Sequence, residues 1–516
     1  MKEKKPFALL ILEAWGVSPN SQENPFNLAK ISNFDRFVKE YPVMTLYASG
    51  KEVGLCDEKI GNSISGHLNI GTGRIFPDNI SRINRAIADE SLFEKRVLKS
   101  AIEHVEENNS TLHITAAFDN NHYARFNHFE AILKFLQKQK VKKVSIHVVL
   151  DSEAGKEENA KKSIKKIINK LKVKKNWKIS SISGSFYALN DGFWWDRIES
   201  VYRAMTESEY ERSLPKPMHI MHEAVEKKIP AKEIVPARVE EGETIKSGDA
   251  LIFLNHSPAG SRQLLESFVL PSFNKFSRSY LKDLFCATIV EYEREMPVRV
   301  IFPPLVSHNC LGRVLQENEL SQYRIASVGR YGSISTFFDG FASWEKESIE
   351  TDYVNDPELE DYNLEPGLSL NKLIKKIIRR IDNMESDFFL INISNLDILA
   401  KTNNFSTLVR GVELVDKAIG KIYDHIMAKE GTMFIVGSHP GTENFFNDGK
   451  MIEKSNAVPF IILNEESRGR AGITGDAPEG DLSLLQPAGV LADVAPTILK
   501  ILDIKKPDEM TGRALV

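Results

Sequence analysis

The sequence predicts an α/β protein, and two observations predict this fold class. Several short apolar runs are typical of buried strands in a largely parallel sheet. They span residues 7–12, 143–150, 250–255, 388–393 and 433–437. The segments between these runs, such as residues 406–430, carry the apolar spacing that is typical of helices. Strands that alternate with helices indicate an α/β architecture in which helices cover the sheet.

Length and composition bound the class of protein. A chain of 516 residues exceeds what a single hydrophobic core usually holds, so we expect more than one domain. The formal charge of −4 gives no reason to expect nucleic acid as a partner. The three cysteines show no metal-ligand spacing, which suits the reducing cytoplasm. No apolar segment is long enough to cross a membrane, so we expect no membrane association.

The first apolar run, Phe7–Leu12, follows a basic stretch and therefore has the outline of a signal peptide. Glu13 interrupts the run, and no small-residue cleavage site follows it. We therefore interpret this run as a buried strand.

Three of the predicted strands are followed by side chains that suit phosphoryl chemistry. Glu13 follows the first run and Asp397 follows the fourth. Ser438 and His439 follow the fifth. The carboxyl ends of parallel strands meet at one edge of a sheet, where such folds place their chemistry. Two carboxylates and an imidazole at this edge suit a metal-assisted phosphoryl site, although an acidic residue at a single strand end is also common as a helix cap.

A glycine-rich stretch, GNSISGHLNIG at residues 61–71, indicates a tightly bent backbone that presents a side chain. The side chain presented is Ser63 or Ser65. A serine hydroxyl is a weak nucleophile unless a base or a metal activates it. The stretch therefore predicts either a nucleophile or the relic of one.

The segment GNSISGHLNIGTGR resembles the pattern GNSEVGHLNIGAGR of cofactor-independent phosphoglycerate mutases, which are members of the alkaline-phosphatase superfamily. Further similar segments are LEAWG, HFEAILKFLQKQKVKKV, SGSFYAL, YNLEPGLS, NAVPFI and DEMTGRALV, so the likeness covers essentially the whole chain. The resemblance implies two domains and a monomer. An alkaline-phosphatase-like, discontinuous domain would comprise residues 1–77 and 305–516, with an inserted α/β transferase-like domain at 78–304. Both joints fall in stretches rich in proline and glycine, at 73–79 and 301–312.

The resemblance also implies a serine that is phosphorylated and two manganese ions that activate it. Ser63 matches the nucleophile. The family's ligand positions are partly kept and partly changed. Ser63, Asp397 and His439 are unchanged, Glu13 and Glu453 are carboxylates of altered identity, and Lys401 and Ser438 take the remaining positions.

Lys401 is the most damaging of these changes because an ammonium group cannot ligate a metal. Two unit charges at ~4 Å and an effective dielectric of about 20 interact by about 4 kcal/mol, and a divalent ion would experience roughly twice that repulsion. We expect the charge of Lys401 to neutralise Asp397 and Glu453 in place of an ion. This argument predicts no metal, or at most one divalent ion.

The resemblance further implies a cluster of arginines that holds the phosphate and carboxylate of the substrate. Arg330 stands where the family has a lysine and is the one charge kept. The other positions carry Tyr123, Ser152, Glu153, Ala154, Ser185, Asp191, Ser257 and Gly260. Small neutral side chains cannot grip an anion as the planar arginine fork does, and carboxylates repel it.

We therefore predict a pseudoenzyme that keeps the fold, does not interconvert 2- and 3-phosphoglycerate, and acts by binding or scaffolding with a protein partner. One alternative is a metal-dependent phosphatase or phosphotransferase that uses Ser63 on a different substrate. Another alternative is an active mutase of glycolysis, in which other side chains rebuild the substrate site. Those side chains would be His122, Arg125, Arg262 and Arg330.

Overall fold

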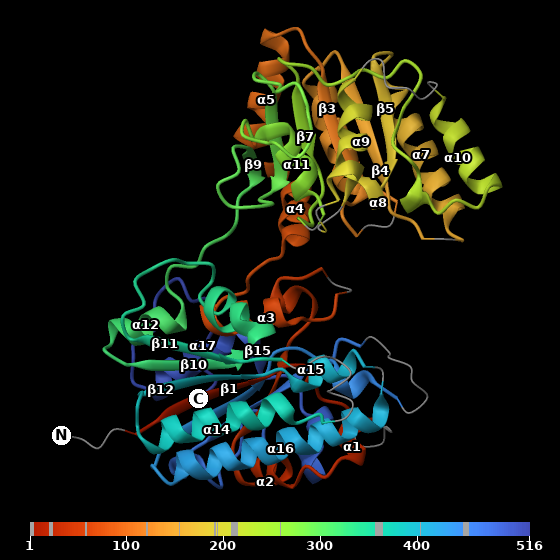
Figure 1. The fold of residues 1–516 in the computed structure, drawn as a ribbon. Coiled ribbons are helices and arrows are strands. Elements are labelled where there is room, and N and C mark those ends of the chain that lie inside the picture. The colour runs from red at the N-terminus through yellow and green to blue at the C-terminus, as the bar shows by residue number, and fades with distance from the viewer. Residues whose placement is uncertain are drawn as a thin grey trace. The chain divides into compact units, whose positions relative to one another are not determined.

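The computed structural model divides the chain into two compact units (Figure 1). Unit 1 comprises Met1–Asp78 and Leu305–Val516, and unit 2 comprises Asn79–Pro304. The structure describes all residues except 1–4, 20–23, 57–58, 120–121, 154, 190–191, 193, 208–214, 259, 357–364, 403 and 447–453. Ala154, Asp191 and Glu453, which the sequence analysis singled out, lie outside the described residues.

Unit 1 is built on a sheet that is parallel over most of its width. In spatial order, the described strands are β11 (Ile349–Val354), β10 (Gln322–Ser327), β12 (Phe388–Ile393), β1 (Phe7–Leu12), β13 (Thr432–Gly437), β14 (Val458–Leu463), β2 (Val43–Tyr47) and β15 (Gly489–Val490). Only β14 runs antiparallel to its neighbours among these strands. The predicted runs at 7–12, 388–393 and 433–437 are therefore strands, and they form the adjacent strands β12, β1 and β13.

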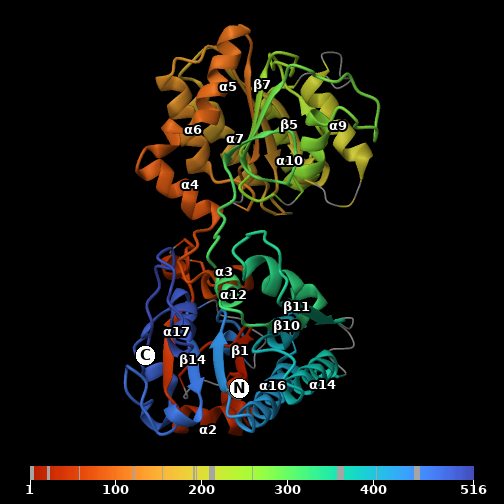
Figure 2. The ribbon, with the colours of Figure 1, turned by 90° about the vertical axis from the view of Figure 1, so that its left-hand side faces the viewer.

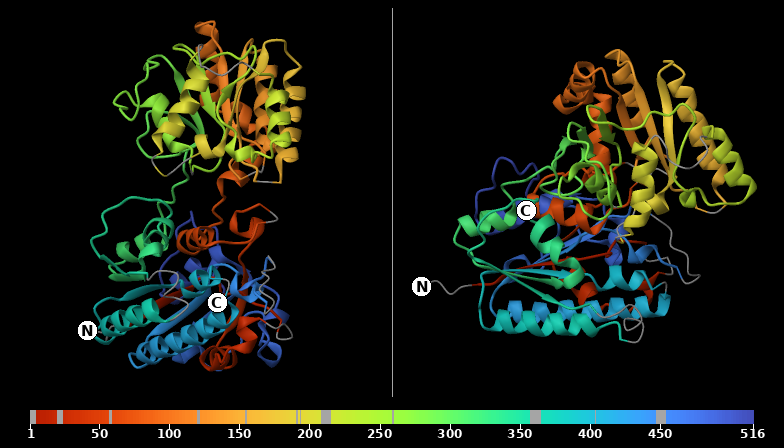
Figure 3. Two further views of the ribbon diagram at one scale, coloured as in Figure 1. Left: turned by 45° about the vertical axis from the view of Figure 1, so that its right-hand side comes forward. Right: turned by 45° about the horizontal axis from the view of Figure 1, so that its top comes forward.

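Helices cover both faces of this sheet, which explains why its central strands are apolar throughout. Helices α14 and α16 lie side by side on one face in the views of Figures 2 and 3. Their buried side chains form one apolar cluster with α2, and α3, α12 and α17 contribute to the cluster on the other face. The described helices of unit 1 are α1 (Pro25–Leu28), α2 (Ser32–Glu40), α3 (Ser63–Thr72), α12 (Leu311–Glu317), α14 (Leu368–Asp382), α15 (Asn395–Ala400), α16 (Phe405–Met427) and α17 (Val494–Ile501).

Unit 2 has a second sheet, in which only the edge strand β6 is antiparallel among the described strands. The spatial order is β6 (Ala237–Arg238), β5 (Trp177–Gly184), β4 (Val144–Leu150), β3 (Leu112–Ala117), β7 (Ala250–Phe253), β8 (Phe285–Val290) and β9 (Arg299–Phe302). Its described helices are α4 (Asn79–Ala88), α5 (Arg96–Glu107), α6 (Phe126–Lys138), α7 (Glu157–Leu171), α8 (Ser185–Ala188), α9 (Trp195–Thr206), α10 (Pro217–Glu226) and α11 (Arg262–Val269). The α/β fold class predicted from the sequence is confirmed in both units.

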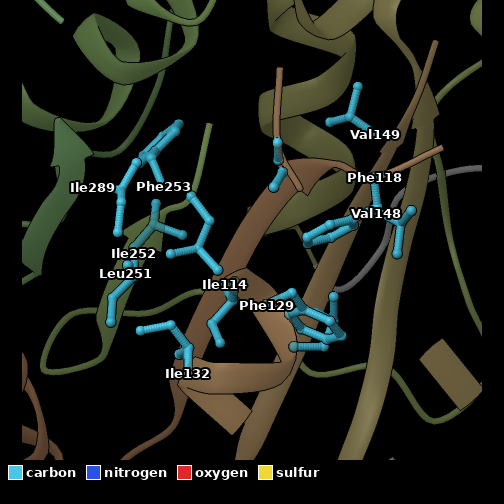
Figure 4. Close-up of a cluster of buried hydrophobic side chains, with 14 of the residues drawn as sticks. Ile114, Phe118, Phe129, Ile132, Val148, Val149, Leu251, Ile252, Phe253 and Ile289 are labelled. Atoms are coloured by element: carbon cyan, nitrogen blue, oxygen red, sulfur yellow. The ribbon is translucent and has the colours of Figure 1, made fainter. Parts of the chain in front are cut away.

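The core of unit 2 lies between its sheet and the covering helices. Figure 4 shows Phe129 of α6 beside Phe118 and Val148, at the end of β3 and in β4. The rings of Phe118 and Phe129 are 4.7 Å apart between centroids. All three side chains are buried. In the part of the chain that the structure describes, no helix is both long and apolar enough to cross a membrane.

A row of buried polar side chains, joined by hydrogen bonds, runs across the sheet of unit 2. Nδ1 of His113 lies 2.9 Å from Nε2 of His147, whose Nδ1 lies 2.8 Å from the hydroxyl of Ser181. Nε2 of His113 lies 3.3 Å from the Asp249 carboxylate. Burial, and then the charge of neighbouring His113, hold the pKa of His147 well below its ordinary value. His147 is therefore neutral in the folded protein.

Acidification is expected to destabilise unit 2. Burial, together with His256 and Arg125 nearby, also lowers the pKa of His128 to about 3. His128 and His147 bind a proton near pH 6.5 in the unfolded chain but not in the fold, so their stabilisation is present above pH ~6.5 and is lost below it. Each should cost about 1.4 kcal/mol per pH unit below that value. Urea unfolding followed by the fluorescence of buried Trp177 measures this dependence.

In the variant His128→Gln, part of this pH dependence should disappear. A free energy of unfolding that stays constant between pH ~7.5 and ~5.5 would contradict the assignment of these two histidines as buried neutral groups.

Candidate functional site

The carboxyl ends of β12, β1 and β13 bring the predicted side chains to one edge of unit 1. The strands are hydrogen-bonded in parallel register up to their last residues. Just beyond them, the backbone amide of Glu13 donates to the carbonyl of Ile393 (3.0 Å), and that of Ser438 donates to the carbonyl of Leu12 (2.9 Å). The loop that starts at Glu13 therefore lies between the segment with Asp397, which follows β12, and the segment with His439, which follows β13.

Ser63 is presented at this edge by the start of helix α3. Asn62 caps the helix, and the side chain of Ser65 completes the capping box. Ser65 is buried in this role, whereas Ser63 is partly exposed. The structure therefore selects Ser63 from the two candidates of the glycine-rich stretch. A side chain at Gly66 is excluded because its Cβ would lie 2.4 Å from the carbonyl oxygen of Ser438.

Glu13 is fully buried, and both of its carboxylate oxygens accept hydrogen bonds. Oε1 accepts from the hydroxyl of Ser63 (3.0 Å) and from Nδ2 of Asn392 (2.8 Å). Oε2 accepts from Nε of Arg330 (2.8 Å). The Ser63 hydroxyl also lies 3.2 Å from that of Ser333. The Ser63 hydroxyl therefore donates to the Glu13 carboxylate, whose charge is neutralised by the guanidinium of Arg330.

Asp397 lies close to Arg330, Lys401 and His439. Nη2 of Arg330 donates to its Oδ2, and Nε2 of His439 lies 3.5 Å from its Oδ1. Nζ of Lys401 is also 3.5 Å away, although most of the Lys401 side chain is exposed. Burial opposes ionisation of Asp397, but the bond and charge of His439, with the charges of Arg330 and Lys401, hold its pKa below the ordinary value. Asp397 is therefore a carboxylate, and Arg330 contacts it more closely than the predicted Lys401.

The buried side chain of His67 contacts Ser63 at the start of α3. Its Nδ1 lies 2.8 Å from the carbonyl oxygen of Ser63 and 3.4 Å from the Ser63 hydroxyl, and its Nε2 lies 3.2 Å from Oδ1 of Asn392. Burial lowers the pKa of His67, so it is neutral. The hydroxyl of Ser438 lies 2.9 Å from Nδ1 of His439 and orients that ring. Both histidines are thus held in fixed orientations around Ser63 and Asp397.

The donors at this edge have the right chemistry for a divalent ion. Carboxylate, hydroxyl and imidazole groups are supplied by Glu13, Asp397, Ser63 and His439. Among the described residues, however, no three acidic, histidine or cysteine side chains are grouped as a ready-made metal site. The guanidinium of Arg330 lies between two of the donors and bonds to both. These residues fit an ion once Arg330 is displaced.

Sequence reasoning missed the partners of Glu13. Asn392 is the one polar residue in the apolar run FFLINI, and a polar side chain inside a buried strand was a signal of a specific contact. Ser333 carried no signal, because it reaches Ser63 through a π-helical turn at Ser333–Phe337. The resemblance assigned Arg330 to substrate binding. Its bonds to Glu13 and Asp397 depend on the register of the strands and on the geometry of its side chain, which local sequence does not show.

Apart from Arg330, the described positions that the resemblance assigns to the substrate lie in unit 2, in the segments that follow β3, β4, β5 and β7. Ser152 is buried, and its hydroxyl donates to Asp119 (2.6 Å). Glu153 pairs with Lys232 (2.6 Å). The backbone of Ser257 donates to the carbonyl of Tyr123 (3.4 Å). Ser185 begins helix α8 and is buried, and Gly260 has a φ of 72°, in the left-handed region. None of these described side chains carries a positive charge.

Comparison with known proteins identifies relatives of the whole chain. A family model described as the metalloenzyme superfamily matches residues 5–506. The chain is 31% identical to a 2,3-bisphosphoglycerate-independent phosphoglycerate mutase of Clostridium perfringens over 528 aligned positions, with 99% of each chain covered. A protein of the same name from Staphylococcus epidermidis is also 31% identical, again over 99% of each chain. The solved phosphoglycerate mutase of Leishmania mexicana, studied at low cobalt concentration, matches 99% of this chain and 97% of its own with a TM-score of 0.71 and 19% identity.

These matches correct the cofactor prediction. No metal, or at most one divalent ion, was expected because two ligand positions carry Lys401 and Ser438. That expectation is wrong, since the family model that matches residues 5–506 describes metalloenzymes. The sequence argument gave too much weight to Lys401, which extends largely into solvent, and too little to the donors that persist at the sheet edge.

Proposed function

The chain belongs to the metalloenzyme superfamily and to the 2,3-bisphosphoglycerate-independent phosphoglycerate mutases within it, and from that premise we propose that it has kept the family's fold but lost the interconversion of 2- and 3-phosphoglycerate. It acts instead by binding, with a partner protein as the proposed ligand and the cytoplasm as the proposed location. The cysteine usage supports that location.

The main support for this proposal is that Arg330 is bonded to two carboxylates of unit 1. Arg330 is the one cation kept from the family's substrate cluster, and a mutase needs it for an anionic substrate. Its guanidinium is instead bonded to Glu13 and Asp397, which satisfy its charge inside unit 1. Burial opposes the charged form, but these two carboxylates raise the pKa of Arg330 above its ordinary value. An arginine held in this way contributes little to gripping a phosphate.

The proposal is supported by the other groups that would have to rebuild the substrate site. Arg262 lies 3.4 Å from Glu266 and 3.5 Å from Glu293, so carboxylates already accompany it. Asp119 accepts hydrogen bonds from the backbone amides of Asp151 and Ser152 at the sheet edge. Asp119 therefore adds a partly buried carboxylate, and Lys232 neutralises Glu153, at an edge where a trianionic substrate requires unpaired positive charge.

Family membership implies divalent metal, and the residues that would hold it are Glu13, Ser63, Asp397 and His439. A bound ion would stabilise negative charge on an oxygen and activate the Ser63 hydroxyl. The protein contributes the orientation of these groups: Asn62 positions Ser63, Asn392 positions Glu13, and Ser438 positions His439. The loss that we propose thus concerns the substrate, and the metal-binding donors remain.

The test is a coupled assay of phosphoglycerate interconversion with Mn2+ present. Metabolic enzymes typically turn over at about 1–1000 s⁻¹, so an active mutase would be detected easily. We expect no turnover above that of the variant Ser63→Ala. Turnover that Ser63→Ala abolishes would overturn the proposal and identify an active mutase.

A metal-dependent phosphatase or phosphotransferase with another substrate is the second candidate. The position of Ser63 favours it, because Ser63 is partly exposed at the first residue of α3 and its hydroxyl donates to the Glu13 carboxylate. This candidate requires hydrolysis of a generic phosphate ester, such as p-nitrophenyl phosphate, that depends on both Mn2+ and Ser63. The same pair of proteins, wild type and Ser63→Ala, distinguishes the two candidates.

A further inference from the structure

We propose that Arg330 is a built-in competitor of the divalent metal: its guanidinium occupies the Glu13 and Asp397 carboxylates and must leave before an ion can bind between them. The inference rests on family membership and on this geometry, and it holds whether or not the chain turns over phosphoglycerate. It makes metal loading an exchange of one cation for another, accompanied by movement of the segment that carries Arg330.

The contacts of Arg330 explain the competition. Nε donates to Glu13 at 2.8 Å, and Nη2 donates to Asp397, so one planar group joins carboxylates from the ends of two neighbouring strands. Glu13 is fully buried, and only about a quarter of each of the Arg330 and Asp397 side chains is exposed, at 23% and 22%. A divalent ion needs the same carboxylate oxygens, and like charges at this separation repel strongly at low dielectric. Arginine and metal therefore exclude one another.

The segment around Arg330 is a short 3-10 turn, Val328–Arg330, in which the backbone amide of Gly329 donates to Asp356 at 3.0 Å. Glycines flank Arg330 as Gly329 and Gly332, and the intervening Tyr331 is exposed. A Cβ at Gly332 would meet nothing closer than 3.7 Å, so the backbone has open space there. The segment ends in the π-helical turn Ser333–Phe337, a form that is rare and frequent at functional sites. Rotation of the Arg330 side chain, or a shift of this short turn beyond the end of β10, would take the guanidinium away from the two carboxylates.

The exchange also changes the environment of Ser63. While Arg330 is in place, the Ser63 hydroxyl donates to Glu13 and lies next to Ser333, which is on the same segment as Arg330. Withdrawal of the segment removes the Ser333 contact and releases a guanidinium. In a metal-loaded molecule, Ser63 would therefore face the ion, and Arg330 would no longer bond to Glu13 and Asp397.

The experiment measures Mn2+ binding by the loss of the free-ion signal in electron paramagnetic resonance. The full chain is compared with Arg330→Gln and with Arg313→Gln, a matched control on α12 whose partner is the nearby Glu317. Apparent affinity falls by the fraction of molecules in which the site is competent, so Arg330→Gln should bind Mn2+ about tenfold more tightly or better. Arg313→Gln should match the wild type.

Three further variants keep the test decisive. Arg330→Lys retains the charge but not the planar fork, so its affinity for Mn2+ should lie between wild type and Arg330→Gln. Adding Glu13→Gln to Arg330→Gln should abolish the gain, because it removes a shared carboxylate. In Arg330→Ala, guanidinium ion added to solution should displace Mn2+, whereas the same concentration of sodium ion should not.

The proposal is overturned if Arg330→Gln binds Mn2+ no more tightly than the wild type, or if the gain survives when Glu13 is changed. Neither result depends on catalytic turnover, so failure of this inference is separate from failure of the proposed function. If Arg330→Gln does not fold, Arg330→Lys tests the same inference with a smaller expected gain, and an affinity no higher than that of the wild type overturns it.

Discussion

Replacing Asp339 with alanine is expected to destabilise unit 1 by about 3–5 kcal/mol, because it leaves a buried arginine without its counter-charge. Nη1 of Arg324 donates to both oxygens of Asp339 at 2.9 Å, and both side chains are fully buried or nearly so. Nη2 of Arg324 donates to Gln322 (2.9 Å), and Lys346 also pairs with Asp339. Equilibrium unfolding in urea measures the loss.

The control for this prediction is Asp382→Ala, which removes an exposed carboxylate that pairs with His425 (2.6 Å). Exposed pairs of this kind contribute about 0–1 kcal/mol, so the control should stay close to the wild type. A loss in Asp339→Ala as small as in the control would show that Arg324 finds another partner.

Asp339→Ala should also change the structure near the candidate site. Nη1 of Arg324 also donates to the carbonyl oxygen of Ile334 (2.8 Å), which lies in the π-helical turn after Arg330. The ion pair therefore anchors the end of the segment that carries Arg330 and Ser333. Amide hydrogen exchange in residues 330–338 should become faster in Asp339→Ala, and it should not change in Asp382→Ala.

Replacing Phe129 with alanine should destabilise unit 2 by about 3–5 kcal/mol, the usual cost of truncating a buried phenylalanine. Phe129 is fully buried, and its ring packs against Phe118 and Phe126 at centroid distances of 4.7 Å and 5.7 Å. Figure 4 shows it among the aliphatic side chains of the sheet, where a cavity cannot collapse easily. Fluorescence of Trp177 during denaturant unfolding measures the change.

The matched control is Phe186→Ala, since 42% of the Phe186 side chain is exposed. Its loss should be below about 1 kcal/mol, because exposed side chains change stability little. Equal losses at the two positions would mean that the packing around Phe129 is loose.

Much of the fold followed from local patterns in the chain. Runs such as FALLIL and FFLINI have no polar alternation, which requires a strand covered on both faces and hence a parallel sheet with helices on each side. From a parallel sheet it follows that Glu13, Asp397 and His439 meet at one edge, and they do. The glycine-rich stretch predicted a tight bend, and the fold adds a second reason for its glycines, because a Cβ at Gly61 or Gly66 would collide with the carbonyl oxygen of Ala48 or Ser438.

The choice between Ser63 and Ser65 could not be made from the chain alone. Both are small hydroxyl side chains in the same stretch, and only the start of α3 assigns one to the cap and the other to the site. The metal expectation failed for a related reason, because the influence of Lys401 was inferred from its alignment position alone. In the fold it extends into solvent, and the donors around it persist.

By itself, the sequence determined the α/β class, the positions along the chain of the strands near the site and the residue types that follow them, since periodicity and strand polarity are local properties of the chain. Only the tertiary structure decided which cation holds the two carboxylates. Arg330 lies 317 positions from Glu13 and 67 from Asp397, and it joins them because β10 is next to β12, which is next to β1. Such a contact depends on sheet register and on the reach of one side chain, and no local pattern encodes either.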